Sequence, residues 1–149
     1  MLFRSPCGSR KGSGDGPYQI QHKLQGIMQD GVGIVRRDAE MRKALDAVLA
    51  MEQEAERVAV PGNREYNPGW HTALDLRNLL TISEAIARAA IDRKESRGGH
   101  FRDDYPDKDP TYGTFNTTLS KAADGSMHLE RMPIPPMPAE LKAVIEENK

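Results

Sequence analysis

A long amphipathic segment in the middle of the chain constrains the possible folds most strongly. From about Gly69 to Glu95, apolar side chains recur at helical spacing, at Ala73, Leu76, Leu79, Leu80, Ile82, Ile86, Ala87, Ala90 and Ile91. A helix of this length extends roughly 40 Å, since each residue adds about 1.5 Å. Its broad apolar face is covered only if two other helices pack beside it.

Two shorter segments can supply these neighbouring helices. The first begins at Pro17, which suits a first helical turn, and ends at Gly31 and Gly33; its apolar side is formed by Ile20, Leu24, Ile27 and Met28. The second has Asp38 as its expected N-cap and continues to about Val58, with an apolar stripe formed by Met41, Ala44, Leu45, Val48, Met51 and Ala55.

Three helices joined by loops predict an all-α fold, an antiparallel three-helix bundle over residues 17–97. We expect the apolar connector at residues 32–36 to tuck against this bundle. Residues 1–16 are rich in Gly and Ser and read as a disordered lead-in.

The remainder of the chain, residues 98–149, is predicted to be a polar loop, a short β-hairpin and a Pro-rich tail. The Asp124-Gly125 pair is typical of a type I′ turn and predicts such a turn between the two hairpin strands. Residues 139–147 are expected to form a last short amphipathic helix.

Composition excludes several classes of partner and site. The 21 basic and 22 acidic residues nearly cancel, so nucleic acid is not an expected partner. Apolar stretches are too short for direct membrane insertion. The single cysteine and a leader without an apolar run favour a reducing, cytoplasmic setting.

No metal site is expected, because His22, His71, His100 and His128 lie far apart in the sequence and the aspartates after residue 102 lack a calcium-loop pattern.

The densest polar segment runs from Arg93 to Pro106, at the end of the long helix. One interpretation is structural, because cations are favoured near the unsatisfied carbonyls of a helix C-terminus. The other is that Arg97, His100 and Arg102 grip carboxylates or carbonyls of a partner protein. A proton-transfer role for His100 is a third possibility, although the sequence supplies no second catalytic group.

Two aromatic residues precede the long helix. Trp70, the only tryptophan, and Tyr66 lie beside a turn, where an aromatic side chain either closes the bundle end or anchors a partner. The candidate docking residues are therefore Arg97, His100, Arg102, Tyr66 and Trp70.

The run from Glu95 to Pro106, ESRGGHFRDDYP, resembles the segment that closes the helical domain of succinate dehydrogenase and fumarate reductase flavoproteins and of their relative L-aspartate oxidase. Three further blocks occur in the expected order: residues 24–36, residues 66–76 and residues 133–141. The resemblance covers residues 17–149 and implies a three-helix bundle. It also implies a parent protein that interconverts succinate and fumarate with FAD and passes electrons to an iron–sulfur subunit and quinone.

The family's FAD-binding and capping domains have no counterpart in this sequence. The resemblance therefore implies a packing and docking domain without catalytic, cofactor-binding or metal-binding residues, whose partners are the parent's FAD-binding domain and the iron–sulfur subunit. FAD would be bound by the parent flavoprotein. The protein would lie in the cytoplasm or be held at the inner face of the membrane by its partner subunits. The unmatched lead-in suggests a truncated or fragmentary gene product.

Two other hypotheses about function are also consistent with the sequence. The chain could be a stand-alone helical interaction module with no enzymatic activity, which requires that it fold alone. It could also be an enzyme in its own right, which predicts bound flavin or succinate turnover. The sequence does not distinguish succinate oxidation from fumarate reduction.

Overall fold

The computed structural model describes residues 15–148, so most of the expected lead-in lies outside the described residues. The chain divides into two compact units, one ending at Lys108 and the other running from Asp109 to the C-terminus. Residues 98–108, the polar loop, belong to the first unit.

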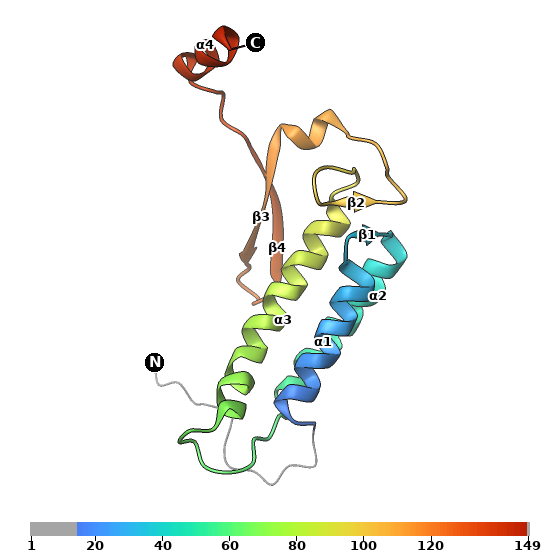
Figure 1. Ribbon diagram of the computed structural model, residues 1–149, viewed down its shortest axis with the longest axis vertical. Coiled ribbons are helices and arrows are strands. Elements are labelled where there is room, and N and C mark those ends of the chain that lie inside the picture. The colour runs from blue at the N-terminus through green and yellow to red at the C-terminus, as the bar shows by residue number, and fades with distance from the viewer. Residues whose placement is uncertain (1–14, 149) are drawn as a thin grey trace. The chain divides into compact units, whose positions relative to one another are not determined.

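The first unit is a three-helix bundle, as the sequence predicts. Helix α1 spans Pro17–Val32, α2 spans Asp38–Ala55 and α3 spans Pro68–Asp92, and each of the three packs on the other two. Helices α1 and α3 run in one direction and α2 runs in the opposite direction (Figure 1). Proline opens α1 and α3, where its missing N–H costs nothing.

The bundle core consists of two apolar clusters at opposite ends. Larger side chains fill the end where α1 and α3 begin: Ile20, Leu24, Val48, Met51, Leu76 and Leu80. Smaller ones dominate the end where α1 and α3 finish: Val32, Met41, Ala44, Ala87 and Ala90. The small residues bring the helices close together, and a Cβ added at Gly31 would lie 2.5 Å from the Cβ of Ala44.

Two helix boundaries differ from the prediction. Asp38 is the first helical residue rather than the N-cap, and Arg37 before it makes no side-chain cap. Helix α3 ends at Asp92 rather than near Glu95, because the backbone becomes extended at Arg93. Gly98 has a positive φ of 59° and lies in a tight turn beyond the helix.

The connector after α1 contains a short strand that the sequence analysis missed. Strand β1, Val35–Arg36, pairs in parallel with β2, Phe101–Arg102. Of the connector's apolar side chains, Val32 packs in the bundle core as expected, but Ile34 and Val35 do not. Ile34 and Val35 are 76% and 55% exposed, because this pairing turns Arg36 inward instead.

The second unit contains a short 3₁₀ helix, Pro110–Gly113, the strands β3, Phe115–Lys121, and β4, Met127–Pro133, and helix α4, Ala139–Glu147. The two strands form the predicted antiparallel hairpin, in which Leu119 is opposite Leu129. The turn is not type I′, because Gly125 has a positive φ and Asp124 does not. Asp124 instead accepts hydrogen bonds from the backbone N–H and the hydroxyl of Ser126.

Candidate functional site

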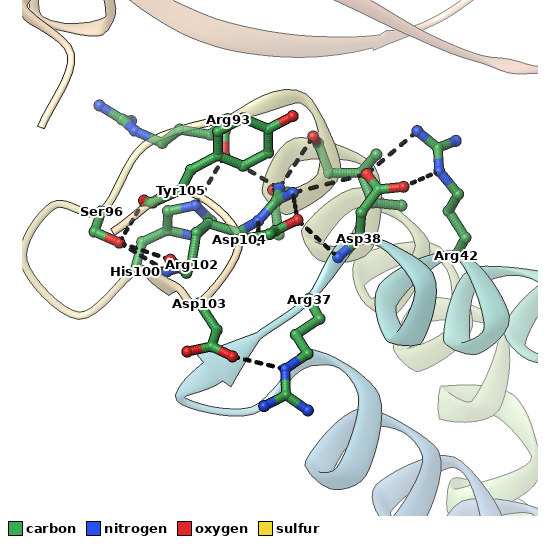
Figure 2. Close-up of polar contacts among 12 residues, drawn as sticks. Arg37, Asp38, Arg42, Arg93, Ser96, His100, Arg102, Asp103, Asp104 and Tyr105 are labelled. Atoms are coloured by element: carbon green, nitrogen blue, oxygen red, sulfur yellow. Dashed lines mark hydrogen bonds and ion pairs between the residues drawn. The ribbon is translucent and has the colours of Figure 1, made fainter. Parts of the chain in front are cut away.

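The segment from Arg93 to Tyr105, which we call the clasp, folds back over the end of the bundle where α1 and α3 finish. It contains three of the candidate docking residues, and Figure 2 shows most of its polar contacts. Two helix C-termini and one helix N-terminus meet at this end, so backbone carbonyls and N–H groups there need partners from outside their own helices.

Arg102 of the clasp caps the C-terminus of α3. Its Nη1 donates hydrogen bonds to the carbonyls of Ala90, Ile91 and Arg93, at 3.0, 3.3 and 3.3 Å. The side chain is fully buried, with 0% exposed. The guanidinium is therefore an internal capping group rather than a surface group, which is the structural interpretation of this basic residue.

Asp104 connects that arginine to the next helix. Its carboxylate accepts hydrogen bonds from Nε and Nη2 of Arg102, at 2.7 and 2.6 Å, and from the backbone N–H of Asp38 at 3.1 Å. The last contact supplies α2 with the N-cap that Arg37 does not provide. Hydrogen bonding from Arg102 lowers the pKa of Asp104 to about 2.

Arg36 performs the same task for α1. Its Nε donates to the carbonyls of Val32 and Gly33, at 3.3 and 2.8 Å, where α1 ends. Its Nη1 lies 2.5 Å from Nδ1 of His100. Burial and the neighbouring charge of Arg102 lower the pKa of Arg36.

His100 uses both ring nitrogens within the chain. Besides the contact with Arg36, its Nε2 lies 3.0 Å from the carbonyl of Arg93. Burial is the main cause that lowers the pKa of His100, and the charges of Arg36, Arg102 and Arg93 add to it. The lowered pKa favours the neutral ring, and the two contacts link β1 to the end of α3.

A buried carboxylate organises the first part of the clasp. Glu95 is fully buried and accepts hydrogen bonds from Nε of Arg93 at 2.9 Å and from Nε and Nη2 of Arg97 at 2.8 and 3.1 Å. Beside it, the hydroxyl of Ser96 accepts from the backbone N–H of Arg102 at 2.8 Å and donates to the carbonyl of Tyr105 at 2.9 Å. These contacts fix the path of the loop.

The β1–β2 pair has its polarity reversed. Arg36 and Arg102 are opposite each other in the ladder and face inward, whereas Val35 and Phe101 form the adjacent pair and are 55% and 40% exposed. Val35 and Phe101 form an apolar surface at the bundle end, which we call the ribbon face, and the exposed Ile34 precedes it in the chain. This ribbon buries its charged side chains and exposes its apolar ones. An isolated ribbon would do the opposite, because burying charge costs free energy and burying apolar surface gains it.

The other two candidate residues lie at the opposite end of α3, which at 25 residues is about 36 Å long. Tyr66 is fully exposed and has a positive φ of 54°, a strained conformation for a residue with a side chain. Trp70 is buried, and the guanidinium of Arg64 lies 5.0 Å from its ring centroid. The candidates therefore form two separate groups.

Sequence reasoning missed Arg36 and Asp104 as capping residues. The role of Arg36 could have been predicted from its position, since a basic residue shortly after a helix end often binds the last carbonyls. The role of Asp104 could not, because Asp104 caps a residue 66 positions earlier in the chain. Among residues 15–148, no three or more His, Cys, Asp or Glu side chains gather where they could hold a metal ion, and no helix is long and apolar enough to cross a membrane.

Residues 21–145 match the family model described as the fumarate reductase flavoprotein C-terminal domain. The chain belongs to this family. It is 31% identical over 117 residues to the fumarate reductase flavoprotein subunit of Haemophilus influenzae, a match that covers 78% of this chain and 20% of that protein. It is 38% identical over 106 residues to the L-aspartate oxidase of Yersinia pestis, covering 67% of this chain and 18% of that protein.

Solved structures include similar domains. A chain of Mycobacterium smegmatis Sdh1, determined in complex with UQ1, superposes with a TM-score of 0.83 at 36% identity, over 96% of this chain and 24% of that one. This C-terminal flavoprotein domain thus spans about a fifth of the curated relatives that it matches. The clasp is the segment that resembles the family most clearly, and its Arg102 and Asp104 cap α3 and α2, whereas Arg36 of β1 caps α1.

Proposed function

We propose that this domain is a packing and subunit-docking element of a succinate dehydrogenase or fumarate reductase flavoprotein, and that the succinate–fumarate chemistry and the FAD site belong to the rest of that protein. In this proposal the parent's FAD-binding domain is the direct partner, and the iron–sulfur subunit is a second one. Membrane attachment would come only through those partners.

The observation that carries the proposal is the ribbon face. The exposed apolar side chains of Val35 and Phe101 are paired, and the charged residues of the same ribbon are used internally as helix caps. Apolar surface with a rigid, hydrogen-bonded support is typical of a patch that a partner covers. Arg97 and His100 lie in the loop that supports it, so we infer that they position this surface rather than carry chemistry.

The test is binding of this chain to the FAD-binding portion of a flavoprotein of the family, such as that of Sdh1, produced as a separate polypeptide. Val35→Lys places a charge in the ribbon face and should weaken binding by at least about tenfold, which corresponds to 1.4 kcal/mol. Titration calorimetry gives the affinity, and flavin absorbance of the purified complex identifies the partner.

Ile82→Lys is the matched control, because Ile82 is 56% exposed on α3 and Val35 is 55% exposed. It should leave the affinity within about twofold of the unmodified chain. Equal weakening by both variants would place the docking surface elsewhere. No binding of the unmodified chain, or flavin bound by this chain alone, would overturn the proposal.

A further inference from the structure

His100 contacts both strand β1 and the end of α3. An arginine donates and does not accept hydrogen bonds, so the 2.5 Å contact with Arg36 requires a lone pair on Nδ1 of the imidazole. The 3.0 Å contact of Nε2 with the Arg93 carbonyl requires a proton on that nitrogen, since a carbonyl only accepts. Both contacts are possible only in the neutral ring with its proton on Nε2.

We propose that His100 is a proton-operated latch: the neutral ring fastens strand β1 to the end of α3, and protonation of Nδ1 releases the strand. A proton on Nδ1 removes the acceptor that Arg36 needs and places two cations at hydrogen-bond distance. The contact with Arg93 survives this change, because Nε2 keeps its proton. The release therefore occurs on the Arg36 side.

The charged groups closest to the His100 ring disfavour the addition of a proton to it. Arginines approach from three elements: Arg36 from β1, Arg93 from the end of α3 and Arg102 from β2. Four carboxylates at this end are engaged by arginines: Glu95 by Arg93 and Arg97, Asp104 by Arg102, Asp103 by Arg37, and Asp38 by Arg42. The lowered pKa of His100 agrees with this arrangement.

Release of Arg36 has a defined structural consequence. The carbonyl of Arg36 accepts a hydrogen bond from the backbone N–H of Asp103 at 3.0 Å, and Val35 pairs with Phe101 in the same ribbon. Loosening of β1 thus separates the apolar side chains of the ribbon face. Acid should then weaken docking as well, a part of the inference that rests on the proposed function.

The sign of the pH dependence follows from the neutral ring. Folding lowers the pKa of His100 from an ordinary value of 6.5, so the unfolded chain takes up the proton first as pH falls. The latch is fully effective above pH 6.5 and is lost between pH 6.5 and the lowered pKa. Below that value both states carry the proton and the loss levels off.

The test uses the full chain and two NMR readouts. The ring carbon signal of His100 should titrate with a midpoint below 6.5, and the protection factor of the Asp103 amide should fall over the same pH range. The fall should be about tenfold for each unit by which the midpoint lies below the ordinary value. His100→Gln, which is neutral but still has one donor and one acceptor, should keep Asp103 protected from pH 7 to pH 5.

His22→Gln, at an exposed position on α1, is the matched control and should leave the fall at Asp103 unchanged. A His100 midpoint at or above 6.5 would overturn the latch, as would an equal fall in the His100→Gln variant. If that variant does not fold, the wild-type titration decides alone, since the latch requires both readouts to change together. All of these measurements are made without a partner, so failure to dock does not affect them.

Discussion

The two ends of the bundle are held together by different physical means. At the apolar end, the cluster around Leu24, Met51 and Leu80 excludes water with large side chains. At the clasp end, three of the five buried core residues are alanines, and Arg36, Arg102 and Asp104 satisfy the helix termini. The same three helices should therefore respond to pH at one end and to lost apolar volume at the other.

The largest effect is expected from Arg102→Met at the clasp end. This change leaves Asp104 without its arginine and removes the donor from three carbonyls at the end of α3; since each buried acceptor left without a donor costs about 1–3 kcal/mol, a total loss of about 3–5 kcal/mol is expected. Urea unfolding followed by circular dichroism measures the loss. Arg102→Lys should be intermediate, because lysine keeps the charge but not the planar fork. A loss for Arg102→Met below about 1 kcal/mol would contradict the capping role.

Leu80→Ala should produce the next largest effect, at the apolar end. Leu80 is 1% exposed, and truncation of a buried leucine costs about 3 kcal/mol through lost burial and the remaining cavity. Since no charge is involved, the loss should be the same at pH 4 and pH 7. A loss that changes with pH would show that the two ends are not independent.

Gly31→Ala tests the close packing beneath the clasp. The added methyl group would lie 2.5 Å from the Cβ of Ala44 and 3.1 Å from the carbonyl oxygen of Glu40, so the helices must separate, at a cost of about 2 kcal/mol. Gly26→Ala, on the same helix with nothing within 4 Å, should instead stabilise by up to about 1 kcal/mol. Chemical unfolding of both variants gives the comparison, and equal signs would rule out steric contact as the cause.

The smallest effect comes from the acid titration of Asp104. Folding lowers the pKa of this carboxyl from 3.8 to about 2, so its stabilisation is complete above pH 4 and is lost as pH falls toward 2. The loss should be about 1 kcal/mol, because solvent screens a side chain that is 30% exposed. Unfolding free energies measured from pH 5 to pH 2 test this, and Asp104→Asn should flatten the curve. An unchanged curve in that variant would assign the loss to other carboxylates.

Much of the architecture could be predicted from periodicity alone. The apolar spacing of α3 required two covering helices; one begins at Pro17 as expected, and the other begins at Asp38, one residue before the predicted start. The hairpin was also predicted, although a positive φ at Gly125 alone produced a different turn type. Local sequence predicts these features because each depends on residues a few positions apart.

The arrangement of the clasp could not be predicted in the same way. A basic residue after a helix is equally consistent with a cap and with a docking contact, and only the tertiary path decides that Arg102 is buried. Two-residue strands have no periodicity, so the β1–β2 pair left no signal, and the exposure of Val35 followed from that pair. The strain at Tyr66 is likewise invisible in a sequence.

The contact between Asp104 and the N–H of Asp38 also has a consequence for the order in which the protein is made. The residue that needs the cap leaves the ribosome 66 residues before the residue that supplies it. Since chains are synthesised at about 5–20 residues per second, α2 has no N-cap for several seconds or more. Helices α1 and α2 can pair through Leu24 and Met51 during this interval, whereas the opposite end of the bundle closes only after the clasp has been made.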